Sequence, residues 1–168
     1  MRAFAIALVL TLIASAAVAQ PPAAQAPDQT PKTFTTAADV QALLAKAKSD
    51  HKEGQTNVLE PILLLPPYRA NLEYRTGVGP GAVHEREAEL MYVIDGSGTI
   101  VIGGKLVEEK RTNAENLTGT SIEGGTSRTF AKGDFLIVPE NTPHWFSAIN
   151  GTLVLMTFHV PRTVGSPQ

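Results

Sequence analysis

Short apolar or alternating segments, each closed by a turn signal, follow one another from residue 58 to residue 160. The turn signals that separate them are Pro66-Pro67, Asp95-Gly96-Ser97-Gly98, Gly103-Gly104, Gly124-Gly125, Lys132-Gly133 and Asn150-Gly151. Such sequences supply the backbone conformations of tight turns between strands. Because no helical periodicity lies between the segments, this part of the chain predicts an all-β fold, an antiparallel sandwich or barrel.

Ten strands are expected in this region. Their ranges are 58–65, 69–75, 82–84, 89–94, 99–102, 105–109, 126–130, 134–138, 144–149 and 152–160. Barrels of this kind either fill their interior with side chains or keep a pocket at the mouth. The polar stretch 107–125 is expected to be a long hairpin or loop that reaches out of the barrel, and surface decoration is a simpler interpretation of it than a lid.

A single helix is expected before the strands, over residues 37–50 of a helical segment that spans 35–56. Thr36 followed by Asp39 resembles a capping box with Asp in place of Glu or Gln. An apolar stripe follows at helical spacing and consists of Val40, Leu43, Leu44 and Ala47. The helix is expected to cover one end of the β-domain, and His51 just beyond it is expected to interact with the helix dipole.

Residues 1–19 have the parts of an export signal. Arg2 supplies the positive charge, an apolar run follows, and a small-x-small cleavage site, AVA, directly precedes Gln20. The alternative, an uncleaved membrane anchor, is disfavoured because the apolar run is short and no later segment reaches the roughly 20 apolar residues that span a bilayer. The mature protein is therefore expected to be periplasmic or secreted, without stable membrane insertion.

The mature chain is expected to consist of a flexible Pro- and Ala-rich tether over 20–34, the helical segment, a β-domain over 57–162 and a tail over 163–168. A formal net charge of −2 at pH 7 provides no basic field, so nucleic acid is not an expected partner. The chain contains no Cys, so any metal must bind to His and carboxylate side chains.

Two blocks of sequence combine such side chains with Gly and Pro. The first block, GPGAVHEREAELMYVIDG, spans residues 79–96 and contains His84 and Glu89. The second block, GDFLIVPENTPHW, spans residues 133–145 and contains His144. These two histidines are candidates for a site because each lies in a β-rich block that turn residues interrupt.

The two blocks resemble the paired motifs of the cupin superfamily, which are His-x-His, Glu, six residues and Gly, and later Gly, five residues and Pro-x-Gly-x-x-His. In the second block Asn141 stands where Gly is usual, and Asn tolerates the positive φ of a tight turn better than other residues with a side chain. The resemblance covers about 75–160. It implies an antiparallel jelly-roll β-barrel of the cupin type, with a metal ion bound by side chains that point inward.

The His-x-His pair is incomplete in this chain. Counted back from Glu89, His84 takes the second His position and Ala82 stands at the first. In the register shifted by two residues, Arg86 stands at the second position instead. The resemblance therefore implies a set of two His and one carboxylate, formed by His84, Glu89 and His144. Such a set suits one divalent ion, Fe, Mn, Zn or Ni, with open coordination positions.

Side-chain parity sets a condition on this ligand set. Residues 84 and 89 would point to opposite faces of one continuous strand, so both can face inward only if the polar run 85–88 forms a turn or bulge. Glu85 or Glu87 could be the ligand instead if that turn takes another form. His159, in the last strand, is a weaker candidate, because a His on a strand is more often an ordinary core residue.

The expected ligand besides the metal is a small polar molecule in the barrel mouth. Arg86 is a candidate to bind a substrate carboxylate through its guanidinium, and Tyr92 and Phe146 are candidates for further contacts with the molecule. The resemblance implies a metal-dependent dioxygenation or isomerisation. The alternative is a metal-free cupin module that binds a small molecule without catalysis.

Two further expectations concern the barrel as a whole. An empty lipocalin-like barrel is disfavoured, because lipocalin ligands need no histidine at a strand mouth, whereas the second block places His144 there. The apolar run 62–65 predicts a homodimer formed through edge strands.

Overall fold

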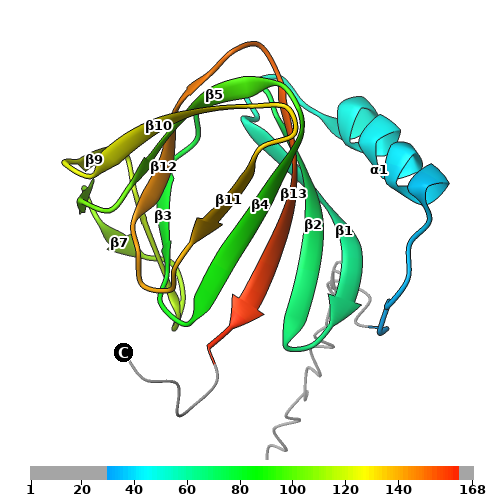
Figure 1. Cartoon of the computed structure of the whole chain (residues 1–168), viewed down its shortest axis with the longest axis horizontal. Helices are drawn as coiled ribbons and strands as arrows, with labels where there is room; N and C mark the ends of the chain where they lie inside the picture. The colour runs from blue at the N-terminus through cyan, green and yellow to red at the C-terminus, as the bar shows by residue number, and fades with distance from the viewer. Residues whose placement is uncertain (1–29, 163–168) are drawn as a thin grey trace, which may run out of the picture.

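The structure is a computed structural model that describes residues 30–162, and its architecture is two facing antiparallel β-sheets with one helix outside them (Figure 1). The predicted export signal, the first part of the predicted tether and the predicted tail lie outside the described residues. The first sheet has five strands in the order β1-β2-β13-β4-β11. Their bounds are Asn57–Leu65 for β1, Tyr68–Arg75 for β2, Leu153–Pro161 for β13, Glu87–Asp95 for β4 and Phe135–Val138 for β11.

The second sheet has six strands in the order β10-β5-β12-β3-β8-β7. Their bounds are Thr126–Ala131 for β10, Ser97–Ile102 for β5, His144–Ile149 for β12, Gly81–His84 for β3, Asn116–Gly119 for β8 and Lys110–Arg111 for β7. A separate two-stranded sheet pairs β6, Lys105–Val107, with β9, Ser121–Glu123. The arrangement confirms the predicted antiparallel jelly roll with one helix.

All ten expected strands form, and their ends lie within two residues of the predicted ends. The stretch 107–125 differs more, because it forms β7, β8 and β9 and adds two strands to the second sheet. β8 pairs with β3 in a register that places Thr118 opposite Ala82. Two of its three side chains, Asn116 and Thr118, are polar, and both line a polar cavity. The sequence did not predict this strand, because its low hydrophobicity is also typical of a surface loop.

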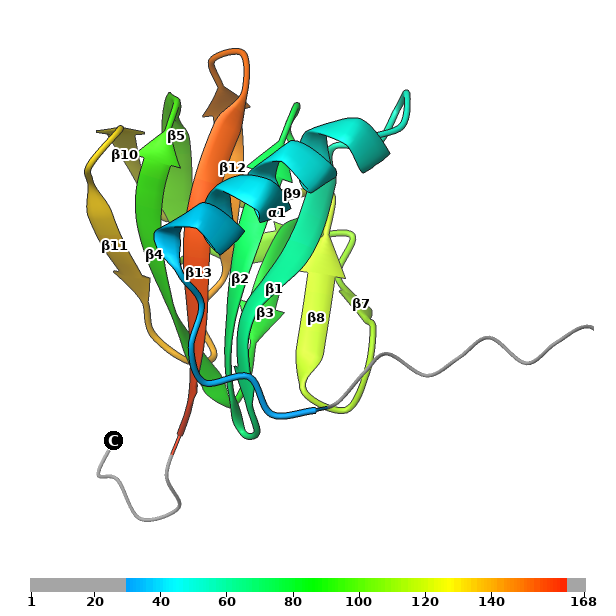
Figure 2. The ribbon, with the colours of Figure 1, turned by 90° about the vertical axis from the view of Figure 1, so that its right-hand side faces the viewer.

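The helix α1 runs from Ala37 to Asp50 and lies across the outer face of the five-stranded sheet (Figure 2). Its N-terminus has the predicted capping box. The backbone N–H of Asp39 donates to Oγ1 of Thr36 over 3.1 Å, and the backbone N–H of Thr36 donates to Oδ2 of Asp39 over 3.0 Å. Under the helix lies an outer core whose buried members are Ile62, Ala70, Leu72 and Val154. The helix therefore covers a sheet face rather than one end of the barrel.

His51 caps the C-terminus of α1, and its ring also contacts the segment that follows. Its Nε2 atom lies 2.7 Å from the carbonyl oxygen of Gln55 and 2.9 Å from Oγ1 of Thr76. These contacts fix the connection between the helix and the sheet. Within residues 30–162, no helix has the length and apolarity needed to cross a bilayer.

The space between the two sheets has an apolar part and a polar part. The apolar part is a buried core that consists of Met91, Val93, Ile100, Phe130, Val138, Phe146, Leu153 and Leu155. Inward side chains repeat every second residue on a strand, so β4 carries Met91 and then Glu89 into the interior. The inward row of β13 ends at His159, the register partner of Glu89. Both strands thus change from apolar to polar at the same end.

The apolar run 62–65, on which the predicted homodimer rests, is largely used within the chain. Ile62 is buried and Leu63 packs against the outer core, whereas Leu65 is exposed. Leu64 forms two backbone hydrogen bonds with Lys32, at 2.7 and 2.9 Å, so the end of the tether covers part of the β1 edge. Dimerisation stays a prediction, which sedimentation at micromolar concentration would test.

Candidate metal centre

His84 and Glu89 face the interior from consecutive strands. β3 ends at His84 and β4 begins at Glu87, with a turn between them. The turn is shorter than the polar run 85–88, but it breaks the alternation of side chains as parity requires. Nε2 of His84 consequently lies 3.5 Å from Oε2 of Glu89.

His144, the first residue of β12, completes the group that the sequence predicts. Its Nε2 atom lies 3.0 Å from Oε2 of Glu89, and its Cα pairs with that of Ala82 on β3. The turn before it contains Asn141, whose φ of 54° is the positive value expected at a position where Gly is usual. The backbone N–H of Asn141 donates to the carbonyl oxygen of His84 over 2.7 Å. The turn of the second motif is thereby tied to the strand of the first.

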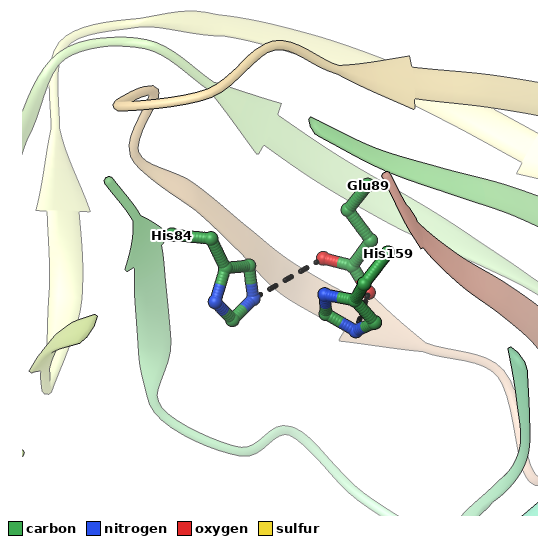
Figure 3. Close-up of side chains that lie close together, drawn as sticks. All are labelled: His84, Glu89 and His159. Carbon is green, nitrogen blue, oxygen red and sulfur yellow. Dashed lines mark ion pairs between the residues drawn. The ribbon is translucent and has the colours of Figure 1, made fainter. Parts of the chain in front are cut away.

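A fourth side chain, His159, lies in the same group. Its Nε2 atom lies 3.8 Å from Oε1 of Glu89, its register partner on β4. Figure 3 shows Glu89 between His84 and His159, with one carboxylate oxygen directed toward each ring. One donor atom from each of these three residues lies within 4.8 Å of the others, close enough to share one ion. His159 is therefore part of the cluster and not an isolated strand histidine.

In His84 and His144, the ring nitrogen that points away from Glu89 contacts an amide oxygen. Nδ1 of His84 lies 2.5 Å from Oδ1 of Asn116 on β8, and Nδ2 of Asn116 donates to Oδ1 of Asn113, which fixes the orientation of the amide. Nδ1 of His144 lies 3.2 Å from the carbonyl oxygen of Thr142. Amide oxygens only accept hydrogen bonds, so both Nδ1 atoms carry a proton. Nε2 of each ring is therefore the nitrogen that faces the cluster, where it can donate a proton to Glu89 or, without that proton, bind a metal ion.

His159 has a carboxylate behind its ring, at ion-pair distance but without hydrogen-bond geometry. Its Nδ1 atom lies 3.2 Å from Oε2 of Glu87. Glu87 is itself held by two hydrogen bonds from the guanidinium of Arg69, at 2.8 and 2.7 Å. A carboxylate behind a histidine is the arrangement that fixes the ring and raises its basicity in metal sites. All three imidazoles thus direct Nε2 toward the carboxylate of Glu89.

The protonation states follow from burial and from these neighbours. Burial acts to raise the pKa of Glu89, but the hydrogen bonds of His144 and His84 hold it well below its usual range. Burial lowers the pKa of His159, and the negative charge of Glu89, which acts to raise that pKa, only partly offsets the effect of burial. Burial also acts to lower the pKa of His84, but hydrogen bonds to Glu89 and Asn116 outweigh it and raise that pKa. Glu89 is therefore ionised and His159 neutral, the forms in which both bind metals.

The two acidic alternatives to Glu89 are engaged elsewhere. Glu85 accepts two hydrogen bonds from Arg111, at 2.8 and 2.9 Å, and Glu87 is held by Arg69. Glu89 is 5% exposed, and within residues 30–162 its ion-pair partners are all imidazoles. Of the three carboxylates, Glu89 alone faces the Nε2 atoms of the cluster, whereas Glu87 lies on the Nδ1 side of His159.

The predicted contacts to a small molecule fall in different places. The side chain of Arg86 is 75% exposed and lies 3.6 Å from Glu115, outside the cavity beside the cluster. Tyr92 alternates with the inward-facing Met91, so its ring packs on the outer side against Phe135, with 5.2 Å between centroids. Phe146 lines the cavity. The structure thus brings one of the three candidates, Phe146, to the site.

A cavity of about 530 Å³ contains the cluster at its wall. Its neutral polar lining includes Thr56, Asn57, Asn71, Asn113, Asn116 and Thr118. The guanidinium groups of Arg69 and Arg75 also line it. Trp145, whose Nε1 donates to the carbonyl oxygen of Gly79 over 2.9 Å, forms part of the wall. The cavity can therefore hold a small molecule with several hydrogen-bonding groups.

Several of these lining residues come from β2 and could have been found from its sequence. Polar residues occupy positions 69, 71, 73 and 75 of β2, and mostly apolar ones lie between them. Such alternation is usually interpreted as a polar face toward solvent. In this fold the apolar face is covered by α1, and the polar face lines the cavity. Asn116 had no such signal, because its strand was expected to be a loop.

A jelly-roll β-barrel with a histidine and glutamate cluster between its sheets defines the class of protein. A family model described as cupin matches residues 65–163, more than half of the chain. The protein therefore belongs to the cupin family.

Solved structures to which the chain is similar include KdgF from Halomonas sp., with 17% identity over 67% of this chain and 87% of that chain and a TM-score of 0.45. The cupin domain of Cnp3 from Schizosaccharomyces pombe has 11% identity over 70% of this chain and 73% of that chain, with a TM-score of 0.48. An RmlC-like cupin from Shewanella frigidimarina has 13% identity over 68% of this chain and 84% of that chain, with a TM-score of 0.44. No curated protein matches the sequence.

Proposed function

We propose that the protein binds one divalent metal ion between its sheets and holds a small polar molecule beside that ion in the cavity. The four ligands that we assign are His84, Glu89, His144 and His159. One observation carries the proposal: the Nε2 atoms of three imidazoles converge on one buried carboxylate, at 3.0, 3.5 and 3.8 Å.

The electrostatics of this cluster favour a cation at its centre. The Nε2 lone pairs face the lone pairs of the ionised Glu89 carboxylate, which is unfavourable without a proton or a metal ion between them. A buried carboxylate is costly unless a cation compensates it, and within residues 30–162 no Lys or Arg pairs with Glu89. Three imidazole nitrogens and one carboxylate oxygen suit Fe(II), Mn(II), Ni(II) or Zn(II).

His159 supplies the imidazole that the incomplete His-x-His pair lacks. Ala82, which stands at the first His position, pairs with His144 in the second sheet and lines the cavity. His159 reaches the same group from β13 in the opposite sheet. The set of three His and one Glu is thus completed by a strand that lies outside both motifs.

A bound metal ion would supply a Lewis-acid or redox centre for an isomerisation or a dioxygenation of a small polar compound. The side chains of the protein position that compound. Asn71, Asn113 and Thr118 offer donors and acceptors to its hydroxyl or carbonyl groups, while Phe146 and Trp145 limit the volume and keep water away from one side.

The test compares wild-type protein with single-histidine variants after each has been offered Fe(II), Mn(II), Ni(II) and Zn(II) and then dialysed. The wild type should retain about one equivalent of at least one ion, and H84A, H144A and H159A should each lose it, because each removes a ligand. H51A is the matched control, since it removes the one histidine outside the cluster and should retain metal like the wild type.

Two results would contradict the assignment. Full metal retention by H159A would remove His159 from the ligand set. A wild-type protein that retains less than about 0.2 equivalents of every ion would overturn the metal site and leave the metal-free binding module as the function.

The proposed location of the protein is the periplasm or the medium. The support is the sequence of residues 1–19, with its positive start, apolar run and AVA cleavage site. Mass spectrometry of the protein expressed from the full sequence should find Gln20 at the N-terminus. An intact chain that begins at Met1 would contradict export by cleavage.

A further inference from the structure

The guanidinium of Arg75 is a second charged group in the cavity, apart from the histidine cluster. Its Nε and Nη2 atoms each lie 2.7 Å from Oε2 of Glu73, and its carbon lies 4.8 Å from the centroid of the Phe146 ring. The two charged side chains are 17% and 5% exposed. The third nitrogen, Nη1, lies beside Gly79 on the cavity wall and has no hydrogen-bond partner within residues 30–162. The guanidinium is thus fixed while one of its donor groups stays available.

An unpaired acceptor lies on the register partner of Arg75. Asn57 is the register partner of Arg75 across β1 and β2, and it lines the same cavity. Its Nδ2 atom donates to Oε2 of Glu73 over 3.4 Å, which directs Oδ1 elsewhere. Oδ1 is buried and has no hydrogen-bond partner in the described part of the chain. Buried acceptors are normally satisfied, so a donor on a ligand is expected at this atom.

The two groups lie close enough to the histidine cluster for one ligand to reach both. Phe146, under the guanidinium, follows His144 by two residues on β12. Oε1 of Glu73 lies 3.3 Å from Oγ1 of Thr157, which precedes His159 by two residues on β13. Two residues of a strand span about 7 Å. A chain of about four carbon atoms with its terminal oxygens covers that distance.

The charges around the cavity favour an anion once a metal is bound. Two arginine–glutamate pairs, Arg69 with Glu87 and Arg75 with Glu73, lie on either side of Glu89. The two arginines and the three glutamates, including Glu89, carry one net negative charge in total. A bound divalent ion would change this net charge to +1. A monoanionic ligand would then leave the site neutral, which a partly buried cavity favours.

We propose that the small molecule is a hydroxylated monocarboxylate, whose carboxylate binds Nη1 of Arg75 and whose neighbouring hydroxyl donates to Oδ1 of Asn57. This inference rests on the proposed function, because the other end of the ligand lies at the metal. A guanidinium N–H to a carboxylate is a charge-assisted hydrogen bond, stronger than one between neutral groups. Arg75 thus takes the role that the sequence predicts for Arg86.

Two probes that differ in one group test this inference. Erythronate and erythritol share a hydroxylated four-carbon chain, and only erythronate has a carboxylate. Trp145 is the only tryptophan and lines the cavity, so its fluorescence reports binding of either probe. Wild-type protein should bind erythronate more tightly than erythritol by about tenfold or more, the effect of a hydrogen bond to a charged group.

Variants assign that preference to Arg75. R75Q should bind both probes with similar affinity, whereas R86Q, which removes the same charge outside the cavity, should keep the wild-type preference. R75Q leaves Glu73 without its partner, so E73Q/R75Q provides a neutral pair of similar shape as a second variant. N57D adds a negative charge beside the guanidinium and should weaken erythronate binding without weakening erythritol binding to the same extent.

Metal content is measured on the same samples, so the carboxylate anchor at Arg75 and the proposed metal site can be contradicted separately. Erythronate binding to E73Q/R75Q as tight as to wild type, equal binding of both probes to wild type, or no binding of erythronate would each overturn the carboxylate anchor, even with metal retained. A wild type without metal would overturn the proposed function instead. If the wild type holds no metal, a preference for erythronate that depends on Arg75 still supports the carboxylate anchor. The absence of that preference overturns the anchor.

Discussion

His159 and Glu89 lie directly opposite each other in the antiparallel ladder of β13 and β4, with Nε2 of His159 3.8 Å from Oε1 of Glu89. The pairing of these strands, and not a short sequence motif, brings the fourth side chain to the cluster. A slip of one residue in this register would turn His159 to the outer face of the sheet. The composition of the site therefore depends on the ladder as much as on the two motifs.

Moving the imidazole from residue 159 to residue 82 should restore metal binding. His159→Ala removes one proposed ligand, and Ala82→His adds an imidazole beside His144, where the His-x-His pair would have it. In a competition with a chromophoric chelator, A82H/H159A should bind metal at least about tenfold more tightly than H159A. A double variant no better than H159A would contradict the view that His159 replaces a missing histidine at residue 82.

Glu87→Gln should weaken metal binding without removing a ligand. The carboxylate of Glu87 lies 3.2 Å from Nδ1 of His159 and places a negative charge behind that ring. Loss of such an outer partner typically lowers metal affinity by about 10–100-fold. E85Q is the matched control, because Glu85 pairs with Arg111 away from the cluster. Equal affinities of E87Q and E85Q would show that Glu87 does not orient the ligand.

Metal affinity should fall as the pH falls. The pKa of His84 is raised by its hydrogen bonds to Glu89 and Asn116, so a metal ion must displace a proton from His84 even near neutral pH. Each displaced proton lowers the apparent affinity by about tenfold per pH unit below that pKa. Titrations at pH 8, 7, 6 and 5 measure this slope. An affinity independent of pH over this range would contradict imidazole ligation.

Thr36→Ala should destabilise the fold and leave the metal site intact. The variant loses one half of the capping box of α1, a loss that typically costs about 1 kcal/mol of unfolding free energy. Urea unfolding should show a lower midpoint, while metal content stays at the wild-type level because α1 covers the outer face of the sheet. An unchanged midpoint would show that the helix contributes little to stability.

Most of the fold could be predicted because turn residues and side-chain alternation are local signals. The glycines of the turns show why: Gly96 has a φ of 95°, and a Cβ there would lie 2.3 Å from the carbonyl oxygen of Thr152. Only Gly fits this turn, so the residue marks it. The strand β8 carries no such signal, because its polar side chains are typical of a surface loop as well as of a strand beside a polar cavity.

The site could be predicted only in part, for a related reason. His84, Glu89 and His144 lie in spaced motifs, and the turn that parity required between the first two is present. His159 becomes a site residue through the pairing of β13 with β4, strands that are distant in sequence, whereas Arg75 lies on the polar face that the alternation of β2 already shows. Such pairings depend on the whole topology, and one sequence does not specify them in advance.

Anomalous diffraction from crystals of the metal-loaded protein tests the central claim most directly. With Zn(II), one anomalous peak should lie about 2.0–2.1 Å from Nε2 of each of the three cluster histidines and about 2.0–2.2 Å from an oxygen of Glu89. H51A crystals should show the same peak. The absence of a peak between the sheets, or a peak bound to side chains other than these four, would contradict the account.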